Sequence, residues 1–90
     1  MTISPNEAAR GRVVTITDDL LTVELKDGRV ISTPLMWYPR LEAATPEDRA
    51  VWEWIGDGSG IHWPLIDEDL SIEGMLEGVA SIEYRKLTHA

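Results

Sequence analysis

One short stretch of the sequence brings together residue types that can hold a metal ion or transfer a proton. It contains His62, Asp67 and Asp69, an imidazole followed by two carboxylates. These groups are accepted zinc ligands, and the same groups act as general acids and bases. The alternative is that the two aspartates fix a turn and cap the next helix. We favour this alternative because the only other histidine, His89, lies in an expected tail. We therefore predict no catalytic site, metal or cofactor.

Two further similarities to chemical motifs fail because essential parts are missing. Asp67, Asp69 and Ser71 imitate the start of a calcium loop, but Gly78 stands where the bidentate glutamate belongs. Ser59 lies between two glycines, yet no lysine follows it and no histidine and acid are placed around it in the order that nucleophile motifs require. The sequence therefore predicts a flexible linker around Ser59.

Five aromatic residues divide into a predicted surface group and a predicted core group. Trp54 lies on the expected apolar stripe of a helix and Trp63 on a short apolar strand, so both are expected in the core. Trp52 falls off that stripe, and with Trp37 and Tyr38 it forms the best candidate for an exposed aromatic surface. We predict partner-binding residues at Trp37, Tyr38, Trp52, Asp67 and Asp69.

Length and composition predict a single small domain. A chain of 90 residues has room for one core, and 43% apolar residues supply it. The sequence contains no cysteine, so disulfides and thiolate chemistry are excluded. It shows neither a signal-peptide pattern nor an apolar stretch long enough to cross a bilayer, so we expect a cytoplasmic protein without a membrane partner.

The charge balance narrows the expected partners. Sixteen acidic residues against eight basic ones give a formal net charge of -8. This charge repels phosphate backbones, so direct nucleic-acid binding is not expected. It attracts basic protein surfaces, although surplus acid also serves solubility. We therefore predict a small basic protein as partner, with a homodimer as the alternative.

The residues from Arg12 to Leu35 predict a three-stranded antiparallel meander, because β-branched runs alternate with turn residues. A three-residue hairpin loop with Gly28 in the left-handed conformation is preferred over a two-residue loop. It places Val23 opposite Ile31 and gathers the apolar side chains on one face.

Helix signals dominate the middle of the chain. Pro39 suits the start of a short helix to about Ala44. Thr45 and the residues after it predict the main helix, which is expected to bury Ala50, Val51, Trp54 and Ile55 and to end at Gly56. Residues 61–63 are expected to add a short edge strand, and Ser71 to cap a short helix that ends at Gly78.

These elements predict an α+β fold: a three-stranded antiparallel meander plus a short added strand, with two or three short helices packed on one face. Residues 11–79 form the expected single domain. Residues 1–10 are interpreted as a flexible N-terminal arm and residues 80–90 as a C-terminal tail, with a strand that orders on a partner as the alternative for the tail.

The whole pattern resembles a bacterial family, the domain of unknown function 2442. The resemblance rests on the hairpin from Leu21 to Gly28, on Trp37-Tyr38-Pro39, on the helix start from Ala44 to Asp48, and on Ile61-His62-Trp63-Pro64 with the acidic residues after it. It implies a small α+β fold with no assigned activity. Some relatives carry a helix-turn-helix, for which this chain is too short after Gly78, and others are paired with a second small protein as if toxin and antitoxin. We expect a non-enzymatic interaction or regulatory module, in one version the antitoxin-like member of a pair. The alternatives are a self-associating structural domain, or a small enzyme or metal-binding protein that uses His62, Asp67 and Asp69.

Overall fold

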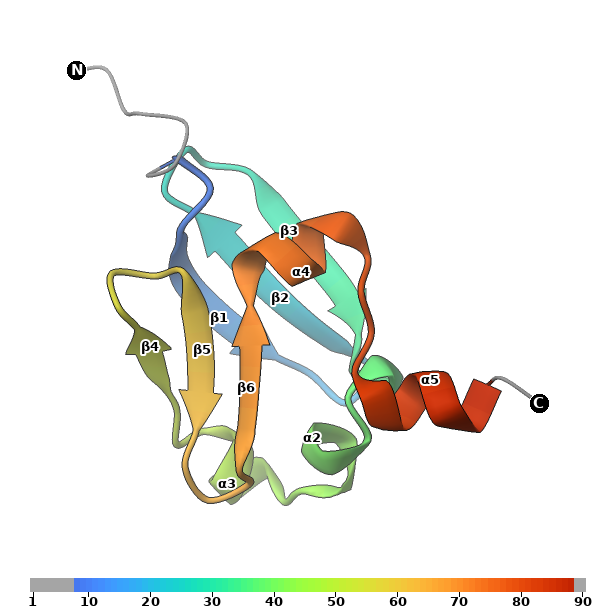
Figure 1. The fold of residues 1–90 in the computed structure, drawn as a ribbon. Coiled ribbons are helices and arrows are strands. Elements are labelled where there is room, and N and C mark those ends of the chain that lie inside the picture. The colour runs from blue at the N-terminus through green and yellow to red at the C-terminus, as the bar shows by residue number, and fades with distance from the viewer. Residues whose placement is uncertain (1–7, 89–90) are drawn as a thin grey trace.

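Two three-stranded antiparallel sheets make up the fold of this chain, as a computed structural model that describes residues 8–88 shows (Figure 1). The first sheet has the order β1-β2-β3 and the second the order β4-β5-β6. The strands are β1 (Gly11–Ile16), β2 (Leu20–Leu25), β3 (Val30–Pro34), β4 (Glu53–Ile55), β5 (Gly60–Trp63) and β6 (Glu68–Ser71). The helices are η1 (Leu35–Trp37), α2 (Pro39–Ala43), α3 (Pro46–Arg49), α4 (Ile72–Glu77) and α5 (Ile82–Thr88). The predicted α+β class is confirmed.

The predicted meander and its register are confirmed in the first sheet. Val23 lies opposite Ile31, and Thr22 lies opposite Ser32, with their hydroxyl groups 2.9 Å apart. Gly28 has a φ of 93° and its amide donates to the carbonyl of Leu25 at 3.0 Å, as the three-residue loop requires.

The core lies between the two sheets. Leu21, Val23 and Leu25 of β2 contribute one side, and Ile61 and Trp63 of β5 contribute the other; all five are fully buried. Leu35, Tyr38, Leu41, Ile72 and Met75, from the helices and the turn between η1 and α2, complete the cluster. The second sheet therefore covers the face that the sequence assigned to helices, while α4 lies at one end of the sheets and α2 and α3 at the other (Figure 1).

The main helix predicted after Thr45 is wrong in its length. Thr45 accepts a hydrogen bond from the Asp48 amide at 3.2 Å, so the predicted cap is correct, but the helix ends at Arg49. Residues 53–55 then form β4, with Trp54 opposite Ile61. The predicted buried stripe is wrong as well: Ala50, Val51 and Ile55 are exposed, and Trp54 is half-buried. Aromatic and β-branched side chains in alternation suit a strand better than a helix.

Residues 58 and 59 belong to a turn and Gly60 begins β5, so the flexible linker predicted here is wrong. The turn joins β4 to β5, and Gly58 and Gly60 are both buried. The Gly58 carbonyl accepts a hydrogen bond of 2.7 Å from the Gly11 amide, which ties the turn to β1. The strand at residues 61–63 is the central strand of the second sheet, so its prediction as an edge strand is wrong.

Two short helices match their predictions closely. Helix α2 begins at Pro39 and ends at Ala43. In α4 the Ser71 hydroxyl accepts from the Gly74 amide at 2.9 Å, and Gly78 ends the helix with a φ of 76°. The acidic stretch before Ser71, predicted as a turn and cap, instead continues into β6 from Glu68 onward.

The end of the described chain is helical and attached to the domain. Ala80 is buried, and the Ser81 hydroxyl donates to the Trp37 carbonyl at 2.8 Å before α5 begins. Residues 82–88 are thus a helix where the sequence suggested a tail. Most of the predicted N-terminal arm, and His89, lie outside the described residues. No helix within residues 8–88 has the length and apolar character needed to cross a membrane.

Candidate functional site

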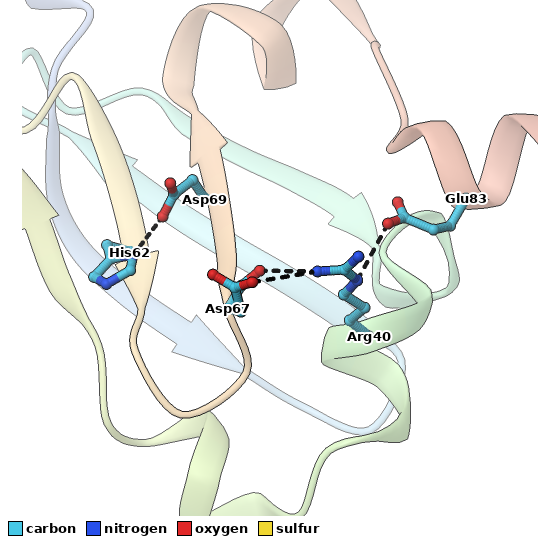
Figure 2. A network of polar contacts seen from close by, with 5 residues as sticks. All are labelled: Arg40, His62, Asp67, Asp69 and Glu83. Carbon is cyan, nitrogen blue, oxygen red and sulfur yellow. Dashed lines mark hydrogen bonds and ion pairs between the residues drawn. The ribbon is translucent and has the colours of Figure 1, made fainter.

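The outer face of the second sheet carries a row of polar side chains in register. Glu53 of β4 lies opposite His62 of β5, which in turn lies opposite Asp69 of β6. Side chains on one face of neighbouring strands point the same way, so the imidazole lies between two carboxyl-bearing positions. Nδ1 of His62 and Oδ1 of Asp69 are in hydrogen-bond contact (Figure 2). The row is open to solvent, since Glu53 and Asp69 are exposed and His62 is half-buried.

Asp67 belongs to a second polar group. Nη1 of Arg40 donates to the Asp67 carbonyl at 3.1 Å and lies 3.9 Å from its carboxylate, while Nε of Arg40 lies 3.2 Å from Oε1 of Glu83 (Figure 2). Arg40 therefore links α2, the turn before β6 and the start of α5. Asp67 has a φ of 55°, a left-handed conformation that aspartate tolerates in turns.

The candidate metal or acid-base set is thus only partly assembled. His62 and Asp69 meet, but Asp67 contacts Arg40 and not the imidazole. Among residues 8–88, no three histidine or carboxylate side chains converge in a way that could hold a metal ion. A histidine–aspartate pair of this kind can position a proton or bind a cationic group.

Glu68 is a partly buried carboxylate at the start of β6, and the sequence placed it only in an acidic turn. Burial raises the pKa of its carboxyl group, the charge of Glu83 raises it further, and Arg40 opposes both. Its Oε2 atom is buried and has no hydrogen-bond partner among the described residues. Its inward position follows from the register of the second sheet, which the sequence alone does not show: Glu68 lies opposite Trp63, whose side chain faces the core. A residue at that position points inward whatever its polarity.

Glu68 lines an open cleft of about 390 Å³ between β6, α4 and α5. Met75, Val79 and Ala80 give the cleft an apolar wall, and Glu83 lies at its edge. A carboxyl group with a raised pKa in a cleft is a general candidate for a functional residue. Tyr38 also lines the cleft; its hydroxyl donates to Thr33 at 3.0 Å, and burial raises its pKa.

The predicted aromatic surface is divided by the fold. Tyr38 is 1% exposed and belongs to the core, so its prediction as a surface residue is wrong. Trp37 and Trp52 are half-buried and pack against the core with one side. Trp52 contacts Trp54 edge to face, with ring centroids 5.0 Å apart. Trp63 is fully buried as predicted, and its indole donates to the Arg49 carbonyl at 3.0 Å.

Comparison with known proteins assigns the chain to a family of proteins of unknown function. A family model described as "Protein of unknown function (DUF2442)" matches residues 12–81. A crystal structure of a protein of unknown function from Rhodospirillum rubrum is 26% identical, with a TM-score of 0.69 over 82% of this chain and 92% of that one. A solution structure of an uncharacterized protein from Chromobacterium violaceum is 23% identical, with a TM-score of 0.70 over 87% of this chain and 74% of that one. No curated protein matches the chain.

Proposed function

Because this chain belongs to the DUF2442 family, a family of proteins of unknown function, we propose its function from its own surface: it is a non-enzymatic module that binds a small basic protein. The observation that carries the proposal is the distribution of charge. Arg10, Arg12, Arg29 and Arg40 each pair with a carboxylate of the same chain. Arg49 donates instead to the carbonyls of Leu41 and Glu42. The cations of the domain are therefore largely engaged.

The carboxylates, in contrast, are in surplus on the surface. Within residues 8–88, seven exposed acidic side chains have no ion-pair partner: Asp18, Asp19, Glu42, Glu47, Glu53, Glu73 and Glu77. A surface of this kind speeds encounter with a basic protein and disfavours nucleic acid and anionic lipid. In a narrower version of the proposal, suggested by the family resemblance, the basic partner is the toxin-like member of a two-protein pair.

The proposal is tested with the product of the neighbouring gene and with capture from the native cytosol. We expect one small basic protein to bind the full chain, with an association rate that falls as salt is added. Replacing two of these unpaired carboxylates together, Asp18→Asn and Glu47→Gln, should slow association several-fold. The matched control, Glu73→Gln with Glu77→Gln on α4, should change it less. A partner without basic surface, or binding insensitive to salt, would contradict the proposal.

Self-association is the second candidate, and one observation favours it. Val13, Leu20 and Val30 are 44%, 41% and 61% exposed and lie toward the outer side of the first sheet. Exposed apolar residues on a sheet face mark a surface that a second copy can cover. Sedimentation of the purified chain distinguishes the two candidates: a dimer that Val13→Thr and Val30→Thr dissociate supports self-association, and a monomer excludes it.

A further inference from the structure

Strand β1 has an unpaired edge in its second half. The Thr17 amide donates to the Leu20 carbonyl at 2.9 Å, so Thr17 faces β2. Backbone groups alternate in direction along an antiparallel strand, and Thr15 therefore also faces β2 while Val14 and Ile16 face away from it. β1 is the outer strand of its sheet, and within residues 8–88 no other strand pairs with the side of β1 that Val14 and Ile16 face.

The first part of the β1 edge is protected. At the start of β1, the outward Gly11 amide is taken by the Gly58 carbonyl at 2.7 Å. The free part of β1 is thus short, and it has room for roughly four or five residues of an added strand.

A groove of about 350 Å³ runs beside this free edge. Val14 and Ile16 form one wall, and Pro46, Ala50 and Trp52 supply the apolar surface opposite. Arg49 also lines the groove, but its guanidinium donates to the carbonyls of Leu41 and Glu42 in α2 at 2.9 and 2.8 Å, so its N–H groups are engaged there. The groove therefore offers apolar contact together with unpaired backbone groups, which is the combination that receives an extended peptide.

Acidic residues follow closely in sequence after residues that line the groove. Asp18 and Asp19 lie in the turn after β1, and Glu47 follows Pro46. All three side chains are exposed and have no ion-pair partner within the described chain. Their charge is complementary to lysine or arginine on an incoming segment.

We propose that the edge of β1 and the adjoining groove bind an extended basic segment of the partner protein, which adds a strand to the first sheet. This inference rests on the proposed function, because it assigns the place where the basic partner binds. Apolar side chains of the segment enter the groove, its basic side chains face the surrounding carboxylates, and its backbone pairs with Val14 and Ile16.

The probe for this proposal is a fluorescent synthetic peptide of about ten residues in which valine and lysine alternate. We expect the full chain to bind it at low salt. A second peptide, identical except for methyl groups on the backbone nitrogens of alternate residues, keeps charge and side chains but cannot pair along one edge. It should bind about tenfold more weakly, and a peptide with glutamate in place of lysine should not bind.

Two proline variants test the same point from the protein side. Val14→Pro removes an outward amide and should weaken peptide binding about tenfold. Val30→Pro is the matched control on the opposite edge of the same sheet, because Val30 also directs its backbone groups away from β2. This variant should bind the peptide within about twofold of the original chain. Trp52→Ala should weaken binding through the loss of the groove wall. The comparison of the methylated and unmethylated peptides uses the unaltered chain, so it tests the proposal even if a variant does not fold.

Each outcome separates this inference from the proposed function. Equal binding of the methylated and unmethylated peptides, or equal effects of the two proline variants, overturns the edge assignment. If the edge assignment fails in this way but the lysine peptide still binds and the glutamate peptide does not, the proposed binding of a basic partner still holds. If the chain instead dimerises and Val14→Pro dissociates the dimer, the edge belongs to a second copy and the inference is wrong. Failure to bind any basic probe or partner overturns both proposals.

Discussion

The hydroxyl of Tyr38 donates a hydrogen bond of 3.0 Å to the hydroxyl of Thr33, and both side chains are buried. Thr33 is 3% exposed, and among the described residues it is the one polar residue that is buried together with Tyr38. The bond explains how a threonine and a tyrosine both tolerate a position at the core, because each satisfies the other. Because its hydroxyl group is used in this bond, Tyr38 lies in the core and not at the surface.

This bond predicts a non-additive pair of substitutions. Tyr38→Phe leaves the Thr33 hydroxyl buried without its partner, so the free energy of unfolding should fall by about 1 to 2 kcal/mol. Adding Thr33→Val removes the unsatisfied group, and the double variant should lose less than the sum of the two single variants. Urea unfolding of the three variants measures this. Simple additivity would show that the hydroxyl groups do not interact.

Glu68→Gln should stabilise the fold at neutral pH. Burial and the charge of Glu83 raise the pKa of Glu68 above its usual 4.5, so the folded chain holds this proton more tightly than the unfolded chain. The free energy of unfolding therefore falls as pH rises through the folded pKa, and the loss is absent below about pH 4.5. Glutamine keeps the shape and carries no charge at any pH.

Unfolding midpoints at pH 7 and at pH 4 test this sign. The gain from Glu68→Gln should appear at pH 7 and shrink at pH 4. Glu77→Gln on the exposed face of α4 serves as the matched control and should show no comparable change. An equal gain at both pH values would mean that shape, and not charge, distinguishes the variant.

The turn at Gly58 should tolerate no side chain. Gly58 has a φ of 107°, and a Cβ atom there would lie 2.6 Å from the Gly11 carbonyl oxygen. Gly58→Ala should therefore cost about 3 kcal/mol or more, since strain and a backbone clash add. Gly28→Ala is the matched control: its φ is 93°, yet nothing lies within 4 Å of its Cβ position, so only strain of about 1 kcal/mol remains. Similar losses for both variants in thermal unfolding would show that the Gly11 contact is not rigid.

The sequence predicted those parts of the fold that local residues determine. In the hairpin around Gly28, the turn residue and the alternation of Val23 and Ile31 both favour one register, and the structure has it. The caps at Thr45 and Ser71 were likewise predicted, because a cap depends on the next three residues. A cap does not determine where its helix ends.

The second sheet could not be predicted in the same way, because its strands are stabilised by partners distant in sequence. Trp54 has spacing that fits either a helix stripe or a strand, and its pairing with Ile61 decides the matter. The same limit applied to the candidate site. Proximity in sequence grouped Asp67 with His62, whereas the fold places Asp67 beside Arg40 and aligns Glu53 with His62 instead.

The attachment of α5 predicts a local effect of one hydroxyl group. The Ser81 hydroxyl accepts a hydrogen bond from the Tyr84 amide at 3.3 Å, so it caps α5. The same hydroxyl donates to the Trp37 carbonyl at 2.8 Å and so joins α5 to η1. Ser81→Ala removes both bonds and should cost about 1 kcal/mol. Because α5 lies at the end of the domain, the loss should appear as faster hydrogen exchange in residues 82–88, while the sheets exchange as before. Ser32→Ala, which removes an exposed hydroxyl bond in β3, is the control and should leave exchange in α5 unchanged. Uniformly faster exchange in Ser81→Ala would show that α5 unfolds only together with the whole domain.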